Sequence, residues 1–86
     1  MKKGRIYAID HGTKRIGTAF SDSSRLFAFP DRVFEGEEEL FAYLRQRHAE
    51  TPIDRVVVGL PLNMDGTEGP RAEDVRMFCR RLEEAA

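Results

Sequence analysis

Two short, unbroken runs of apolar residues with a helical pattern between them constrain the fold of this chain most. The first run covers 6–9, and the second lies within 54–60, where three valines are consecutive. Continuous runs of this kind are typical of interior strands of a parallel sheet, which are buried on both faces. We therefore predict a strand–helix–strand crossover that leaves the two strands parallel and adjacent.

Two helices are predicted, one before and one after the second run. The first begins at Glu37, where three successive glutamates suit the positive end of a helix dipole, and it ends before Thr51 and Pro52. Its apolar face carries Leu40, Phe41, Leu44 and His48. The second begins at Pro70, and its apolar stripe consists of Ala72, Val75, Phe78, Cys79 and Leu82. Solvated helix faces are expected for Glu37, Glu38, Glu39, Arg76, Arg80 and Arg81.

The first third of the chain predicts an antiparallel meander. A polar turn at 10–14 joins the first strand to a second at 15–21, and a third short strand is expected at 26–29. Pro30 cannot donate to a strand ladder, so this third strand is expected at the sheet edge. The resulting order is strand, strand, strand, helix, strand, helix, which is an α/β layer architecture with a mixed sheet.

A chain of 86 residues makes one small domain at most, and residues 1–86 are expected to form it. This length excludes a two-lobed ATPase of the actin or sugar-kinase type, whose phosphate loop would look like 10–13. The single cysteine, Cys79, suits a reducing compartment, so a cytoplasmic protein is expected. Apolar segments fall far short of the roughly 20 residues of a membrane span, and no membrane partner is expected.

Charge is distributed unevenly, although the formal net charge is only −1. Residues 1–32 carry seven Lys and Arg against three Asp, whereas 33–86 carry seven Arg against twelve acidic residues. Because Lys and Arg contacts to phosphates dominate nucleic-acid affinity, a polyanion should bind the first third of the chain. The candidate contacts are Lys2, Lys3, Arg5, Lys14 and Arg15.

Asp10 is the residue that most directly suggests chemistry. It follows the first apolar run and precedes a Gly-containing turn with two cations. Open parallel sheets place their sites at the carboxyl ends of the strands, so Asp10 and the loop beginning at Gly59 should meet at one edge. Taken alone, an aspartate at this position could equally be a turn former that bonds its own backbone.

The stretches IYAIDHGTKRIGTAFSD and VVVGLPLNMDGTEGPRAEDVRMF together resemble the YqgF family, also called RuvX. Its members are described as Holliday junction resolvases and as nucleases that process the precursor of small-subunit ribosomal RNA. The resemblance spans Arg5 to about Leu82. It implies a ribonuclease-H-like fold with sheet order 3-2-1-4-5, which agrees with the element order predicted above.

The resemblance also implies a metal-dependent nuclease acting on branched DNA or precursor rRNA. Asp10 matches the metal-binding aspartate of the first strand, and hard divalent cations such as Mg²⁺ or Mn²⁺ prefer carboxylate oxygens. A second acid is expected in the loop after the 54–60 strand, which offers Glu68, as a metal ligand, and Asp65. Nucleic-acid contacts are expected at the motif positions Gly12, Thr13, Lys14, Arg15 and Asn63.

The family plan continues past the last residue of this chain. A fifth strand and a final helix would follow, with the third metal ligand, so the ribonuclease-H-like domain is expected to be C-terminally truncated and incomplete. The strand at 54–60 would then leave an unpaired edge, and a homodimer through that edge is expected. The alternative function is a catalytically inactive truncated domain that binds RNA or DNA through its basic N-terminal third.

Overall fold

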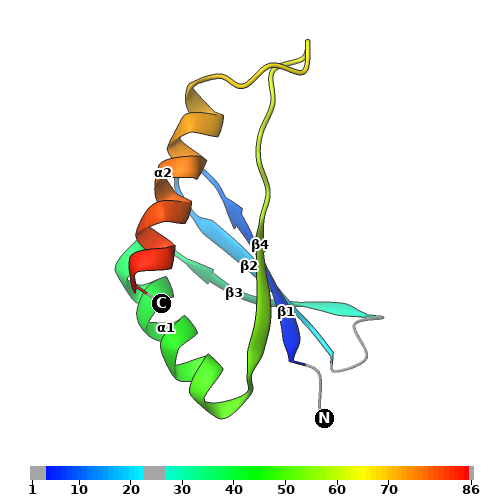
Figure 1. Ribbon diagram of the computed structural model, residues 1–86, viewed down its shortest axis with the longest axis vertical. Helices are drawn as coiled ribbons and strands as arrows, with labels where there is room; N and C mark the ends of the chain where they lie inside the picture. The colour runs from blue at the N-terminus through cyan, green and yellow to red at the C-terminus, as the bar shows by residue number, and fades with distance from the viewer. Residues whose placement is uncertain (1–3, 23–26, 86) are drawn as a thin grey trace.

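A four-stranded mixed sheet carries two helices on one of its faces (Figure 1). The computed structural model describes residues 4–22 and 27–85. The elements in chain order are β1 (Arg5–His11), β2 (Ile16–Ser21), β3 (Ala28–Phe34), α1 (Glu37–Glu50), β4 (Ile53–Val58) and α2 (Pro70–Ala85).

The strand order is β3-β2-β1-β4. β1 pairs antiparallel with β2 and parallel with β4, and β2 pairs antiparallel with β3. The α/β class and the ribonuclease-H-like order of these four strands are therefore confirmed. α1 is the crossover that returns the chain to lie parallel to β1, as the two apolar runs predict.

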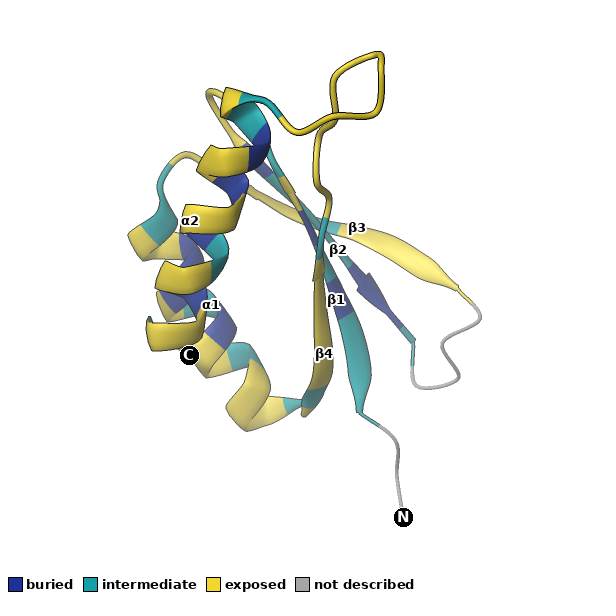
Figure 2. Ribbon diagram, turned by 45° about the horizontal axis from the view of Figure 1, so that its top comes forward, coloured by how far each residue is buried: buried dark blue, intermediate teal, exposed yellow. Residues whose placement is uncertain are grey.

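The core lies between the sheet and the inner faces of the two helices. Figure 2 shows these faces buried, whereas the outer faces of α1 and α2 are exposed. The buried hydrophobic cluster consists of Tyr7, Ile9, Ile16, Phe20, Phe34, Leu40, Phe41, Leu44, Phe78 and Leu82. The apolar faces predicted for both helices are confirmed at Leu40, Phe41, Leu44, Val75 and Phe78. No helix in the described ranges is both long enough and apolar enough to cross a membrane.

The third strand differs from its prediction. The strand starts at Ala28 and continues through Pro30 to Phe34, whereas 26–29 was expected, and Leu26 lies outside the described residues. The register of the β2–β3 pair shifts between Gly17 and Ala19, where Ala19 pairs with Pro30. At this shift the Thr18 side chain makes the hydrogen bonds to β3. The Thr18 hydroxyl donates to the Arg32 carbonyl at 2.6 Å and accepts from the Arg32 N–H at 2.9 Å. This side-chain bridge lets the edge strand continue past a residue that cannot donate.

In the described part of the chain β4 is an edge strand, although its run of valines is typical of an interior strand. β4 lies at the end of the sheet and pairs only with β1, so its other edge has no strand beside it. Val57 is accordingly 48% exposed. The unpaired edge expected for a truncated sheet is present among the described residues.

A polar contact ties β1, β3 and α1 together beside the core. The hydroxyls of Tyr7 and Tyr43 both donate to Asp31 Oδ2, at 2.8 and 2.9 Å. Tyr7 is fully buried, and this burial raises the pKa of its hydroxyl. Tyr7 is thus an aromatic core residue whose polar atom has a partner.

Candidate active site

The ends of β1 and β4 bring two loops to one rim of the sheet. Because the strands are parallel neighbours, their carboxyl ends lie side by side, and the Gly59 N–H donates to the Ile9 carbonyl at 3.1 Å. A pocket of about 440 Å³ opens there, lined by 10–13, by 59–61 and by Arg71. The predicted meeting of Asp10 with the loop beginning at Gly59 is confirmed.

The Asp10 carboxylate is available at this rim. Tyr7 and Ile9 are buried under the helices, so the alternation of strand side chains places Asp10 on the opposite face. Among the described residues, no hydrogen bond or ion pair engages its carboxylate. The turn after it is held by backbone atoms instead, since the Gly12 N–H donates to the Asp10 carbonyl at 3.1 Å. Asp10 is therefore not the side-chain turn former that the sequence left open.

The loop from His11 to Arg15 requires glycine at its second position. The Gly12 N–H also donates to the Arg15 carbonyl at 2.9 Å, which brings the two sides of the loop together. A Cβ atom on Gly12 would lie 2.6 Å from that carbonyl oxygen. Thr13, Lys14 and Arg15 are exposed beside it, and of these only Thr13 lines the pocket.

His11 braces this loop against both helices. Its ring packs on Phe78 of α2 with centroids 4.5 Å apart, and its Nε2 lies 3.5 Å from Glu37 Oε2 of α1. Glu37 also accepts two hydrogen bonds from Arg81, at 2.7 and 2.8 Å, which lower the pKa of the Glu37 carboxyl. Glu37 and Arg81 are thus paired with each other, rather than only solvated as the helical pattern suggested.

Arg71 is a residue of the site that the sequence patterns did not predict. It lies in the first turn of α2, lines the Asp10 pocket, and donates from Nη2 to the His11 carbonyl. The available signal was its position directly after Pro70, because a helix that starts after the second loop begins at the same rim. The contact itself joins residues 60 positions apart, which no local pattern encodes.

The second loop is closed by its own hydrogen bonds. The Asn63 N–H donates to the Thr67 carbonyl at 2.8 Å, and the Gly66 N–H donates to the Asn63 carbonyl at 2.9 Å. Asp65 Oδ1 accepts from both the hydroxyl and the N–H of Thr67, at 2.6 and 3.0 Å, and these bonds lower the pKa of the Asp65 carboxyl. Asn63 and Asp65 are consequently engaged inside the loop.

Glu68 is engaged by α2. Its two carboxylate oxygens accept hydrogen bonds from Arg76 at 2.6 and 2.7 Å, which lower the pKa of the Glu68 carboxyl. Glu68 and Arg76 line a hollow of their own with Gly69, Pro70 and Glu73, and neither lines the Asp10 pocket. The structure therefore does not bring the three candidate acids together.

The candidate cations are also distributed over the sheet. Lys14 and Arg15 lie at the Asp10 rim, whereas Arg5 begins β1 at the opposite end of the strand, with its guanidinium 5.4 Å from the Phe20 ring centroid. Lys2 and Lys3 lie outside the described residues. Arg5 therefore does not join Lys14 and Arg15 in one patch.

Of the described residues that line the Asp10 pocket, Asp10 is the one with a carboxylate. In 4–22 and 27–85, no group of three or more His, Cys, Asp or Glu side chains is placed to hold a metal ion. Asp10 offers oxygen atoms of the kind that Mg²⁺ and Mn²⁺ prefer. The described residues alone do not complete a metal site, because Asp65 and Glu68 have other partners.

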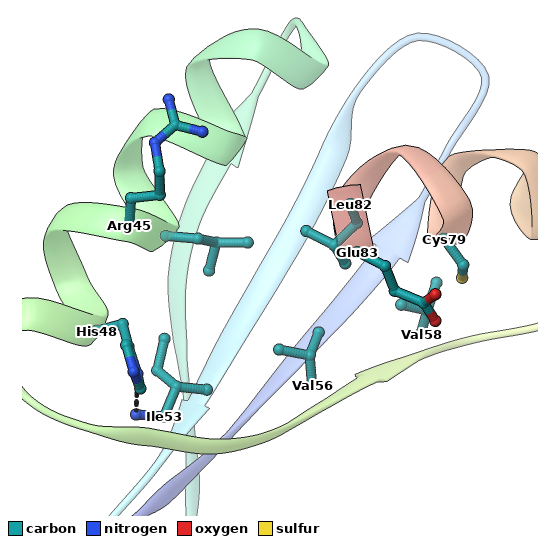
Figure 3. A pocket seen from close by; sticks show the side chains of 9 residues that line it. Arg45, His48, Ile53, Val56, Val58, Cys79, Leu82 and Glu83 are labelled. Carbon is teal, nitrogen blue, oxygen red and sulfur yellow. Dashed lines mark hydrogen bonds between the residues drawn. The ribbon is translucent and has the colours of Figure 1, made fainter. Parts of the chain in front are cut away.

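A second hollow lies away from Asp10, between α1, β4 and α2 (Figure 3). This apolar groove has a volume of about 420 Å³, and its apolar lining residues are Leu44, Ile53, Val56, Val58 and Leu82. His48 Nδ1 accepts from the Ile53 N–H at 2.9 Å at one end, and Glu83 lies toward Val58 (Figure 3). The groove therefore borders the unpaired edge of β4.

Comparison with known proteins identifies the family. The family model RuvX, described as Holliday junction resolvase, matches residues 4–86. The chain belongs to the RuvX family. This RuvX chain is 46% identical over 82 residues to a protein of Rhodobacter capsulatus and 41% identical over 83 residues to one of Syntrophomonas wolfei. Both relatives carry the name "Putative pre-16S rRNA nuclease".

The RuvX chain spans little more than half of these relatives. The matches cover 93% and 94% of the chain but only 52% and 59% of the two relatives. A protein of Maridesulfovibrio salexigens with the same name is 37% identical over 81 residues, with 60% of its length covered. Both rim loops lie within the part that matches the family.

Proposed function

We propose that this chain belongs to a nuclease that cleaves phosphodiester bonds in structured nucleic acid, with Asp10 as its essential carboxylate. The precursor of 16S rRNA is the favoured substrate because it is named in the relatives, and branched DNA is the second candidate. One observation carries the proposal: Asp10 is free of partners in the described chain and lines a pocket where the β1 and β4 loops meet. With an rRNA precursor as substrate, the proposed location of the protein is the cytoplasm.

A divalent cation, Mg²⁺ or Mn²⁺, is the proposed cofactor, with Asp10 as its first ligand. When bound, it would neutralise charge on the phosphate. Glu68 is the proposed second ligand and Asp65 the alternative, and each would first have to leave its present partner. The Glu68–Arg76 pair is exposed on both sides, so exchanging it for a cation costs little. The further ligands that a complete site needs are not grouped among the described residues.

The chain's own residues can perform two tasks in this reaction. The backbone-closed loop after Asp10 fixes the position of the carboxylate at the rim. Lys14 and Arg15, exposed beside it, can contact neighbouring phosphates of the strand, which positions nucleic acid without reading its sequence. Gly12, Thr13 and Asn63 are proposed to shape the contact surface.

The test compares the full chain with Asp10→Asn on two labelled substrates, a precursor 16S rRNA fragment and a four-way DNA junction. Each is incubated with Mg²⁺ or Mn²⁺. We expect the parent to cleave the RNA and Asp10→Asn to be slower by about a hundredfold or more. Glu84→Gln, which removes an exposed carboxylate near the far end of α2, should cleave like the parent. Equal rates for Asp10→Asn and the parent would contradict the proposal.

A binding domain without catalysis is the second candidate function. The observation that favours it is that the described residues contain no group of three or more His, Cys, Asp or Glu side chains placed to hold a metal ion. This function predicts that the parent binds RNA, that affinity falls as salt rises, and that no cleavage occurs with either metal ion. Affinity that does not depend on salt would exclude an electrostatic binding domain.

We also propose a homodimer through the unpaired edge of β4. An edge strand presents free backbone groups that can pair with another chain. Val56, which lines the apolar groove, and Val57, which does not, are both exposed on this strand. In antiparallel pairing, the Ile53 end meets the partner's Val58 end, which brings Arg45 and His48 toward the partner's Glu83. Light scattering after size-exclusion chromatography should show a dimer, and Val57→Lys should shift it to monomer. A protein that stays monomeric at millimolar concentration would contradict the homodimer. It would favour instead that a further segment of a longer chain pairs with the edge of β4.

A further inference from the structure

We propose that Arg71 binds the phosphate group of the nucleic acid strand that enters the Asp10 pocket. This inference rests on the proposed function, because it names the group that receives the phosphodiester next to Asp10. Of the residues that line this pocket, Arg71 is the one arginine or lysine. The other lining residues are Asp10, His11, small or apolar loop residues, and Thr13.

The position of the Arg71 side chain is fixed before any ligand binds. Its Nη2 donates to the His11 carbonyl, so α2 is tied to the loop that follows Asp10. Its Nη1 lies 3.6 Å from Asp74 Oδ2, one turn along the helix, which is too long for a hydrogen bond. An arginine held in this way loses little side-chain entropy when an anion arrives.

Most of the donors of this guanidinium remain available. A guanidinium has five N–H groups, and only one of the described hydrogen bonds uses them. The Arg71 side chain is 39% exposed, so the free donors can reach a ligand in the pocket. Its acidic neighbour, Asp74, is itself 63% exposed, and such a pair contributes little. Arg71 can therefore donate two parallel hydrogen bonds to a phosphate.

The other arginines of α2 provide the contrast. Arg76 is held by both oxygens of Glu68, and Arg81 by both oxygens of Glu37, so their charges are already neutralised. Arg80 is exposed, but it does not line the Asp10 pocket. Arg71 alone of the four combines free donors with a place in that pocket.

Charge gives the reason for a cation at this position. A phosphodiester and the Asp10 carboxylate are both negative and repel each other, and a lining cation lowers this repulsion in addition to any metal ion on Asp10. Lys14 and Arg15 are exposed beside the pocket but do not line it. Arg71 is the side chain that can hold a phosphate in the pocket that Asp10 also lines.

The test uses a fluorescein-labelled single-stranded RNA of 12 nucleotides and measures its anisotropy with the full chain at several salt concentrations. Arg71→Ala should weaken binding about tenfold, because a hydrogen-bonded charge pair is lost. The slope of log affinity against log salt should fall by about 0.7, which corresponds to one phosphate contact on a single strand. Arg80→Ala, the matched control on the same helix, should change affinity by less than about twofold.

A second variant separates phosphate binding from a role in holding the loop. Arg71→Lys keeps the positive charge but cannot donate two parallel hydrogen bonds to one phosphate. This variant should therefore keep the slope of log affinity against log salt while losing part of the affinity for RNA. Equal affinity and slope for Arg71→Ala and the parent would overturn the inference and leave the proposed function intact. Parent protein that does not bind the RNA at all would overturn the proposed function and the inference together. A slope that falls equally in Arg71→Lys would also overturn the inference, since it would assign the effect to the loop.

Discussion

The two loops at the rim differ in whether their acidic side chains take part in holding them. The loop after Asp10 is closed by backbone hydrogen bonds and braced from outside, by Phe78, Glu37 and Arg71. The loop from Leu60 to Gly69 is closed by backbone hydrogen bonds and by its own side chains, and its acids either take part in this closure or are paired with α2. An acid at the same rim is therefore available or occupied according to whether its carboxylate already accepts hydrogen bonds from its own loop or from α2.

This difference explains why Asp10 is the stronger candidate for chemistry. Asp10, Asp65 and Glu68 all follow neighbouring strands of one sheet edge, and residue type does not distinguish them. Their hydrogen bonds do, because the oxygens of Asp65 and Glu68 already accept from Thr67 and Arg76. A free carboxylate beside a fixed backbone is the arrangement that can accept a cation or face a phosphate without first losing a partner.

The largest effect on stability is expected from a substitution of Gly12 in the first loop. Gly12→Ala places a Cβ against the Arg15 carbonyl, which is backbone and cannot move aside easily. We expect a loss of roughly 1–3 kcal/mol in the free energy of unfolding, measured by urea denaturation. Gly17→Ala is the control, because a Cβ there meets nothing within 4 Å. Equal unfolding midpoints for the two variants would show that the loop does not need its close approach.

A smaller effect is expected when the brace behind His11 is weakened. Glu37→Gln removes the charge that pairs with Arg81 and faces His11, and should cost about 0.5–1 kcal/mol at neutral pH. Because the pair lowers the pKa of the Glu37 carboxyl, its stabilisation is present above the ordinary value of 4.5 and is lost as the pH falls through the lower, folded-state value. The variant should therefore lose less stability than the parent on acidification.

The control for this prediction lies in the same helical turn. Glu39→Gln removes an equivalent charge from the start of α1 but leaves the Arg81 pair intact. Its unfolding free energy should follow the parent's dependence on pH between 5 and 3. If Glu37→Gln and Glu39→Gln gave the same pH profile, only the helix dipole would be involved.

The smallest effect on stability is expected in the second loop. Arg76→Ala releases Glu68 from an exposed pair, so the urea midpoint should not change measurably. The pKa of the Glu68 carboxyl should rise toward its ordinary value, which a titration followed by carboxyl ¹³C chemical shifts would measure. If Glu68 is the second metal ligand, Mn²⁺ affinity should also increase. Weaker Mn²⁺ binding by Arg76→Ala would contradict that role.

Much of the fold could be predicted from local signals. The glutamates before α1, Pro70 at the start of α2, and the two apolar runs located the helices and the parallel pair. The end of β3 could not be predicted, because Pro30 normally limits a strand and the compensating hydroxyl of Thr18 comes from another strand. The valines of β4 alone did not indicate its edge position, because apolar composition does not reveal how many neighbours a strand has.

The site was predictable only where topology fixes it. Asp10 and Gly59 end parallel neighbours, so their meeting follows from the strand order. The contributions of Arg71 and Glu37 depend on contacts with His11 across 60 and 26 positions of the sequence, and side-chain periodicity contains no such information. The pairing of Glu68 with Arg76 is likewise decided by how α2 leaves the second loop.

The most direct test of the difference between the two loops is paramagnetic broadening by Mn²⁺ in ¹⁵N–¹H spectra of the full chain. If Asp10 is the available acid, low concentrations of Mn²⁺ should broaden first the amide signals of residues 10–13, Gly59 and Leu60, and Asp10→Asn should abolish this broadening. Broadening that starts at Asp65 and Glu68, or that persists unchanged in Asp10→Asn, would contradict the account.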